Sequence, residues 1–236
     1  KIPEAIVIHV MNEAYWRGVA PWSETLSHYR PFSDEVYGEL KPKFVSEILE
    51  LTGLTKSSLF LDIGCGVGNV VCQASLQTGC TSHGMEIHTE LVDLGQKYFL
   101  PAFKARCSMW GFEPRDIYLR AGDVLKDPSA HSLIRTADVV LVNNRAFKDK
   151  TNIALTELLG DLKNGAWLVT LKALGDGLHS QNSKGNKGQI MKTPWCLTEH
   201  AYPEGSVSWV DTSGHYYVAR VNKPEARILS EGTSCT

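Results

Sequence analysis

Three acidic residues follow three successive apolar segments, and the first of them opens a glycine-rich turn. Asp62 begins this turn, which spans residues 62–69, while Glu86 and Asp123 follow the next two segments. Glycines let the backbone turn tightly and approach a ligand closely. Because ligands of open α/β sheets bind at the carboxyl ends of the strands, we expect the three carboxylates to lie around one ligand.

The spacing and charge of the turn favour S-adenosylmethionine over a nicotinamide dinucleotide. A G-x-G-x-x-G pattern is weak evidence by itself, and here the third glycine follows the second by only two residues. A carboxylate at Asp62 would repel a pyrophosphate, whereas it suits a ligand with a cationic amine and a sulfonium. We expect Glu86 to accept hydrogen bonds from the ribose hydroxyls and Asp123 to meet the adenine amino group. Alternatively, each acid alone is a helix cap or a solvated turn residue.

The elements that position these residues are predicted from the pattern of apolar residues. Short apolar runs predict strands over 59–63, 82–87, 117–120, 138–143 and 167–171. Helical spacing predicts helices over 41–51, 69–78 and 153–162, and a long helix from Leu91 to Met109 that Pro101 kinks or breaks near Leu100. Two further runs, 206–210 and 215–221, predict an antiparallel hairpin.

This order of elements predicts an α/β protein with a doubly wound sheet. Together with the glycine turn it favours the Rossmann-like fold of class I S-adenosylmethionine-dependent methyltransferases, extended by a small helical N-terminal annex and a C-terminal antiparallel hairpin. We expect the annex, with a loop that covers the cofactor, over 1–54, the methyltransferase core over 55–222 and a tail over 223–236.

Composition is that of an ordinary globular domain, with 236 residues of which 43% are hydrophobic and 21% charged. We expect neither a membrane span nor a secretory leader, because no apolar run approaches ~18 residues and the N-terminus lacks a leader pattern. The six cysteines form no C-x-x-C pair and complete no zinc spacing with histidines. We therefore expect free thiols in a reducing compartment and no metal site.

The net charge of −2 means that a nucleic-acid partner would need a local basic patch. One local excess of positive charge runs from Lys172 to Lys192, where four lysines accompany a single acid, Asp176. This segment is either a solvated loop or a contact for an anionic partner.

Four further segments carry a resemblance to a known family. They are YRPFSDEVYGE at 29–39, FKARCSMWG at 103–111, VNNRAF at 142–147, and GSVSW at 205–209, which Tyr216-Tyr217 follows. Together with the glycine turn, these segments resemble the "disruptor of telomeric silencing" family of histone H3 lysine methyltransferases. The resemblance covers roughly residues 26–221, and the segment around Trp110 is most similar to fungal members.

The resemblance implies a nuclear chromatin regulator without a SET domain, involved in telomeric silencing. It implies methyl transfer from S-adenosylmethionine, which becomes S-adenosylhomocysteine, to a lysine in the globular core of histone H3. The implied partner is the nucleosome, with ubiquitinated histone H2B as an optional feature of the substrate. DNA contact would be weak or would use basic flanks that this chain lacks. The alternatives are a methyltransferase of another protein lysine or amine, and a chromatin-binding module without turnover.

The resemblance also implies roles for individual residues. Its cofactor positions fall on Tyr37, Gly38, Glu39, Asp62, Gly64, Gly66, Gly68, Asn69, Glu86, Asp123, Val124 and Asn143, where Val124 replaces the usual Phe. Its lysine channel falls on Asn143, Phe147, Trp209 and Tyr216. An apolar, aromatic channel would lower the pKa of the incoming ammonium group, and aromatic faces tolerate a methylammonium product. Alternatively, Trp209 and Tyr216 belong to the core, and Asn143 with Asn144 forms an ordinary turn.

Overall fold

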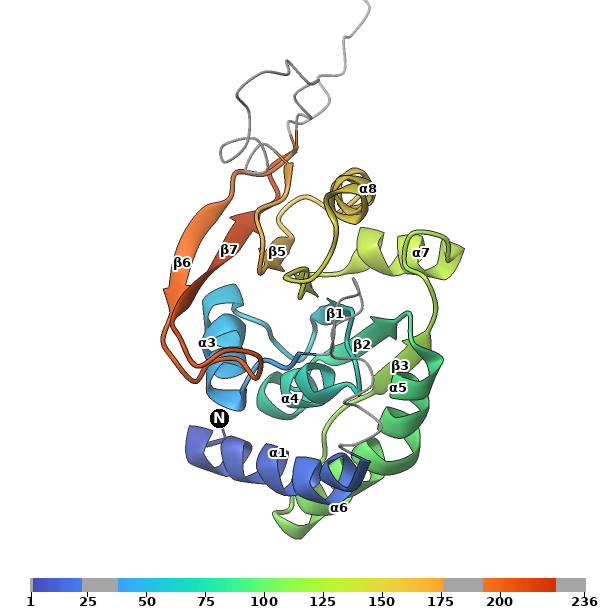
Figure 1. Ribbon diagram of the computed structural model, residues 1–236. Coiled ribbons are helices and arrows are strands. Elements are labelled where there is room, and N and C mark those ends of the chain that lie inside the picture. Colours follow the sequence, from blue (N-terminus) through green and yellow to red (C-terminus); the bar gives the residue numbers. More distant parts are fainter. Residues whose placement is uncertain (1, 23–37, 176–192, 224–236) are drawn as a thin grey trace, which may run out of the picture.

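A seven-stranded mixed sheet forms the centre of the protein (Figure 1). The computed structural model describes residues 2–22, 38–175 and 193–223. The strand order is β3-β2-β1-β4-β5-β7-β6, in which the first five are parallel and β7 runs antiparallel between β5 and β6. The strands are β1 (Leu59–Ile63), β2 (Thr81–Glu86), β3 (Ile117–Ala121), β4 (Val139–Val142), β5 (Trp167–Thr170), β6 (Thr198–Tyr202) and β7 (Gly214–Arg220).

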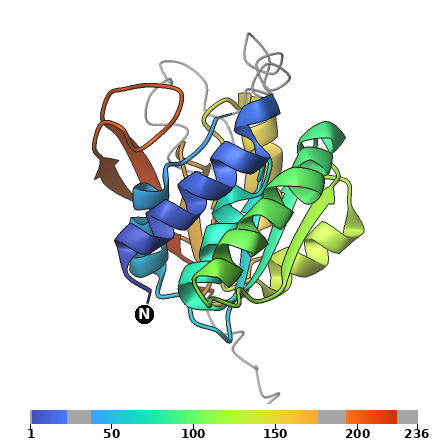
Figure 2. The ribbon, with the colours of Figure 1, turned by 90° about the horizontal axis from the view of Figure 1, so that it is seen from below.

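Helices cover both faces of this sheet (Figure 1). They are α1 (Glu4–Gly18), α3 (Pro42–Thr52), α4 (Asn69–Thr78), α5 (Thr89–Leu94), α6 (Leu100–Met109), α7 (Pro128–Thr136) and α8 (Asp149–Leu159), with a short 3-10 helix η1 (Ala20–Trp22) and a π-helical turn η2 (Gly95–Phe99). Helix α1 lies beside α6 as an outer layer (Figure 2). The predicted doubly wound α/β fold with a helical N-terminal annex is confirmed. The proposed domain boundaries stay predictions.

The central strand β4 shows why the sheet is covered on both sides. All four of its residues are buried. Val139 and Leu141 pack on the α3 side, whereas Val140 and Val142 pack on the α7 and α8 side. Successive side chains of a strand point to opposite faces, so an uninterrupted apolar run requires two apolar layers.

Local signals place most helix ends as expected. Gly53 ends α3 in the left-handed conformation with φ of 62°, and Pro42 occupies its first turn, where a missing N–H group costs little. The predicted irregularity before Pro101 is confirmed as the π-helical turn η2, in which the backbone N–H of Leu100 donates to the carbonyl of Gly95. Helix α7 was not predicted, although Asp127 caps it by accepting from the Ser129 N–H at 2.8 Å.

The predicted first strand of the C-terminal hairpin is wrong. Residues 206–210 form no regular strand, and the partner of β7 is β6 instead. Apolar and polar residues alternate at 206–210 because this segment packs on the chain just before α3, which buries Val207. Val207 forms an isolated bridge with Leu40, and the Lys41 N–H donates to the Ser206 carbonyl at 2.9 Å. Within the described residues, no helix is long and apolar enough to cross a membrane.

Candidate functional site

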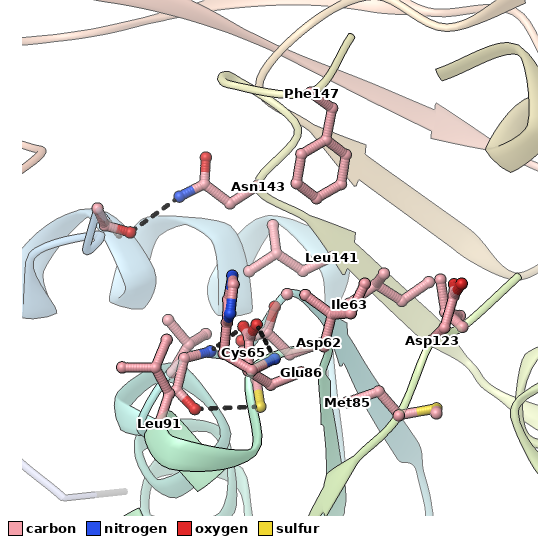
Figure 3. Close-up of a pocket in the computed structure, with 18 of the residues that line it drawn as sticks. Asp62, Ile63, Cys65, Met85, Glu86, Leu91, Asp123, Leu141, Asn143 and Phe147 are labelled. Atoms are coloured by element: carbon pink, nitrogen blue, oxygen red, sulfur yellow. Dashed lines mark hydrogen bonds between the residues drawn. The ribbon is translucent and has the colours of Figure 1, made fainter. Parts of the chain in front are cut away.

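A cavity of about 250 Å³ opens at the carboxyl ends of β1, β2 and β4 (Figure 3). Its walls come from the glycine turn and the start of α4, the ends of these strands, the segments before α3 and after β3, and the N-terminal parts of α5 and α8. Most of the predicted cofactor residues line it: Gly38, Glu39, Asp62, Gly64, Gly66, Asn69, Glu86, Asp123, Val124 and Asn143. The structure therefore brings together residues that are more than 100 positions apart in the sequence.

The glycine turn folds as its sequence predicts. Gly64, Gly66 and Gly68 have φ values of 81°, 55° and 89°, which side-chain-bearing residues rarely adopt. The N–H groups of Gly64 and Cys65 donate to the Met85 carbonyl at 2.8 and 3.1 Å, which fixes the turn against β2. Gly68 does not line the cavity. A Cβ atom on Gly68 would meet Leu119 Cδ2 at 2.5 Å, so this glycine permits close packing, and its cofactor role stays a prediction.

Two buried carboxylates lie beside the turn. Glu86 Oε2 accepts from the Gly66 N–H at 2.9 Å, and its Oε1 accepts from the His88 N–H at 3.0 Å. Asp62 is only 3% exposed, and burial, with a smaller contribution from Glu86, raises its pKa to about 8. A cationic group bound next to Asp62 would restore the ionised carboxylate, because an opposite charge lowers the pKa of an acid. This pair therefore favours a ligand that carries an amine cation.

Asp123 lies apart from that pair, at another side of the cavity (Figure 3). Its Oδ1 accepts from the Leu125 N–H at 3.0 Å, and its Oδ2 forms an ion pair with the exposed Lys126 ammonium at 2.9 Å. Val124 contributes an apolar part of the same wall. This wall combines one acceptor with aliphatic surface, which suits a flat heterocycle that carries an amino group.

Asn143 closes the cavity at the end of β4 (Figure 3). Its Nδ2 donates to the Gly38 carbonyl at 3.1 Å, and its Oδ1 is buried without a hydrogen-bond partner among the described residues. Buried polar atoms are rarely left without partners, so this oxygen is a candidate acceptor for a ligand or substrate donor. The Glu39 N–H donates to Ser208 Oγ at 2.8 Å and thereby holds residues 38–40, the segment before α3 that lines the cavity, in place. Tyr37, also predicted here, lies outside the described residues.

The predicted channel residues divide into two groups. Phe147 lines the cavity and faces the turn, since its Cζ lies 3.5 Å from the position that a Cβ on Gly64 would take. Trp209 and Tyr216 do not line the cavity. Trp209 packs on Gly38, whereas Tyr216 is 5% exposed and packs on Phe44 with ring centroids 5.1 Å apart. The surroundings of Tyr216 therefore agree with the alternative that this residue belongs to the core. The channel roles of Trp209 and Tyr216 stay predictions.

The sequence predicted Val124 and Phe147 but missed the other apolar residues of the cavity. The missed lining residues include Leu40, Ile63, Met85, Ile87, Leu91, Leu125, Leu141 and Leu155. Aliphatic residues in predicted strands and helices look like core, and no local signal separates the two uses. Position offers one signal, because residues one turn into a helix that follows a strand lie at the binding edge of the sheet.

Five of the six cysteines lie in the part of the chain that the structure describes. In the described chain, Cys65, Cys72, Cys80 and Cys107 are buried free thiols, and Cys196 is an exposed one. Cys65 lines the cavity, and burial raises the pKa of its thiol, which keeps it protonated and poorly nucleophilic. The described residues contain no cluster of acidic, His or Cys side chains that could hold a metal ion.

Comparisons with known proteins agree with the motifs. A family model described as histone methylation protein DOT1 matches residues 15–221. The chain is 38% identical over 220 residues to a Gibberella zeae protein named "Histone-lysine N-methyltransferase, H3 lysine-79 specific", and the match covers 93% of this chain and 44% of that protein. A Yarrowia lipolytica protein of the same name is 36% identical over 234 residues, covering 98% of this chain and 46% of that protein. The chain thus spans less than half the length of these relatives.

A solved structure supports the fold. A mutant of MtNAS superposes with a TM-score of 0.50 at 11% identity, covering 93% of this chain and 71% of that chain. The sheet order and this likeness agree with the predicted Rossmann-like class I fold. Because the family model matches most of the sequence, the resemblance seen in the motifs is confirmed, and the chain belongs to the DOT1 family of histone methylation proteins.

Proposed function

We propose that this chain is the catalytic domain of an S-adenosylmethionine-dependent methyltransferase that modifies a lysine in the globular core of histone H3. The observation that carries the proposal is one cavity at the binding edge of the sheet. It gathers Asp62, Glu86, Asp123 and the Asn143 Oδ1 atom, which has no hydrogen-bond partner among the described residues. The relatives are named as specific for lysine 79 of histone H3, and we extend that specificity to this chain.

The residues of the cavity fit S-adenosylmethionine. Gly64 and Gly66 leave room for a ligand against the backbone. Asp62 would be ionised by the cationic amine of the methionine part, Glu86 would accept from the ribose hydroxyls, and Asp123 would accept from the adenine amino group. When bound, this cofactor would supply a methyl group on a sulfonium: a neutral amine would bond to the methyl carbon in line as the C–S bond breaks, and S-adenosylhomocysteine would leave as a neutral thioether.

The chain's own contribution is alignment and exclusion of water. Asn143 Nδ2 is held by the Gly38 carbonyl, so the Asn143 Oδ1 atom has a fixed direction for accepting a hydrogen bond from the methionine part or the substrate amine. The Phe147 ring lies over the turn and gives the reacting end of the cavity an apolar wall. Apolar surroundings lower the pKa of a lysine and favour the neutral, nucleophilic amine. We retain Trp209 and Tyr216 as proposed borders of the lysine channel.

The proposal includes the setting of the enzyme. We place it in the nucleus, with intact nucleosomes as its partner and a role in telomeric silencing. Ubiquitinated histone H2B as an optional feature of the nucleosome belongs to the same proposal, as does a DNA contact that is weak or made by basic flanks. So does the division into an annex over 1–54, a core over 55–222 and a tail over 223–236.

The test uses two recombinant nucleosomes that differ only at lysine 79 of histone H3, which is replaced by arginine in one of them. The expected result is methyl transfer to the unmodified nucleosome, mapped to that lysine by mass spectrometry, and none to the arginine form. Equal labelling of both would instead support the alternative of another lysine or amine. Failure to bind S-adenosylmethionine at millimolar concentration in calorimetry would support the module without turnover.

A further inference from the structure

Three polar side chains just outside the cavity form a hydrogen-bond network that ends on the backbone of Phe147. They are Asn144 after β4, Asn152 in α8 and Lys172 after β5. None of the three lines the cavity. The network therefore lies one layer behind the residues that would touch cofactor or substrate.

Asn144 is the centre of this network and is fully buried. Its Oδ1 accepts from the N–H groups of Leu171 and Lys172 at 3.0 and 2.8 Å. Its Nδ2 donates to Asn152 Oδ1 at 3.0 Å and to the Lys172 carbonyl at 3.2 Å. Backbone N–H groups only donate and carbonyls only accept, so these partners fix the orientation of the amide. The side chain thus joins β4 to β5 beyond the point where their ladder ends.

The next bonds of the network converge on one carbonyl group. Asn152 Nδ2 donates to the Phe147 carbonyl at 3.3 Å, and the half-buried Lys172 ammonium donates to the same oxygen at 3.2 Å. The Phe147 N–H donates in turn to the Asn144 carbonyl at 3.2 Å. The backbone of Phe147 is therefore held on both its N–H and its carbonyl side.

This arrangement matters because Phe147 lines the cavity and Asn143 directly precedes Asn144. Apolar side chains could join the two strands without the cost of burying amides and an ammonium group. Polar networks with every member satisfied are rigid and hold one geometry. In-line transfer depends steeply on such geometry, since a displacement of about 1 Å can lower a rate about 100-fold.

We propose that Asn144, Asn152 and Lys172 are positioning residues that hold Phe147 and Asn143 in the geometry required for methyl transfer. The inference rests on the proposed function. It assigns these side chains no contact with the cofactor or the substrate. Their effect reaches the reaction through the backbone of residues 143–147.

The experiment compares two lysines that each donate to a backbone carbonyl. Lys172→Met removes the ammonium bond to Phe147 and keeps an apolar stem. Lys163→Met is the control near the start of β4, where Lys163 donates to the Thr136 carbonyl at 2.8 Å and forms an ion pair with Asp138 at 2.6 Å. We expect Lys172→Met to lower kcat on nucleosomes about tenfold with KM and Tm little changed, and Lys172→Arg to restore part of the loss. We expect Lys163→Met to keep the wild-type kcat.

A double-mutant cycle shows whether the effect passes through Phe147. In a Phe147→Ala background, Lys172→Met should cause a clearly smaller loss of kcat, because only the part of the effect that passes through Asn143 remains. An equal loss in both backgrounds, or an unchanged kcat in Lys172→Met alone, would overturn the proposal.

A readout without turnover separates this inference from the proposed function. The fluorine resonance of 4-fluorophenylalanine incorporated at position 147 should shift or broaden in Lys172→Met and in Asn152→Ala, but not in Lys163→Met. If the wild-type protein transfers no methyl group, the proposed function fails while this spectrum still tests the positioning. A spectrum unchanged by both substitutions would overturn the positioning itself.

Discussion

Substituting Gly38 by alanine is expected to disturb the reacting end of the cavity with little effect elsewhere. A Cβ atom at this position would lie 2.5 Å from Trp209 Cε3, whereas ordinary contacts begin near 3.4 Å. Either the Trp209 ring or the segment at 38–39 must therefore move by about 1 Å, a shift that can cost about 100-fold in rate. The Gly38 carbonyl also holds Asn143 at 3.1 Å, so movement of the segment reaches the cavity directly.

The expected result for Gly38→Ala is a kcat/KM on nucleosomes that is about 100-fold lower. Overpacking of this kind also destabilises a protein, typically by about 1–3 kcal/mol, which denaturant titration would measure. Gly53→Ala is the matched control. Its added Cβ meets nothing within 4 Å, but its φ of 62° makes alanine strained, so it should lose stability and keep its activity. A Gly38→Ala enzyme with wild-type kcat/KM would refute the coupling between Gly38, Trp209 and Asn143.

Three further predictions concern the cofactor and the nucleosome. Because the pKa of Asp62 is raised to about 8, its carboxyl group is protonated below that pH when no ligand is bound. A cationic ligand must displace this proton, so the affinity for the cofactor should rise from pH 6 to pH 8 and level off above pH 8. Calorimetry should show this slope in the wild type and a flat profile in Asp62→Asn; a slope that survives the substitution would assign the proton elsewhere. Gly64→Arg should abolish both cofactor binding and methylation, because φ of 81° strains any side chain and an arginine at this position would fill the cavity that the cofactor needs; full activity would refute the assignment of the site. Replacing Lys184 and Lys187 by Glu should weaken nucleosome binding and reduce its salt dependence while cofactor affinity stays constant, and an unchanged salt slope would show that these lysines face solvent only.

Local sequence signals predicted the centre of the fold well. Strand β1 and helix α4 have the predicted bounds, because the apolar residues Leu59 to Leu61 mark a buried strand and the glycine turn determines where the strand ends and the helix begins. Asp62, Glu86 and Asn143 reach one cavity because the carboxyl ends of parallel strands share one edge of the sheet. Both the bounds of these elements and the meeting of the three side chains follow from a parallel sheet, which the alternation of strands and helices along the sequence already predicts.

The failures occurred where a contact between distant segments decides the structure. The alternation at 206–210 is typical of a strand, yet Val207 pairs with Leu40, about 170 residues away in the sequence. Tyr216 belongs to a predicted strand that is confirmed, and its ring packs on Phe44 of α3, a contact that the sequence does not show. The channel role of Tyr216 stays a prediction. In the sequence, Asn144 is typical of an ordinary turn after a strand. Its side chain makes four hydrogen bonds, to residues of α8 and to the segment at the end of β5, and these depend on contacts between distant segments.

The most direct test of the central proposal is transfer of a labelled methyl group from S-adenosylmethionine to three substrates in parallel. These are reconstituted nucleosomes, free histone H3, and a peptide around the core lysine. We predict labelling of nucleosomes with little or none on the peptide, because a lysine in the folded core is recognised together with the surface that surrounds it. Labelling of the peptide as efficient as that of the nucleosome would contradict recognition of a folded surface. Absence of labelling on all three, in a protein that binds the cofactor, would contradict the proposed substrate.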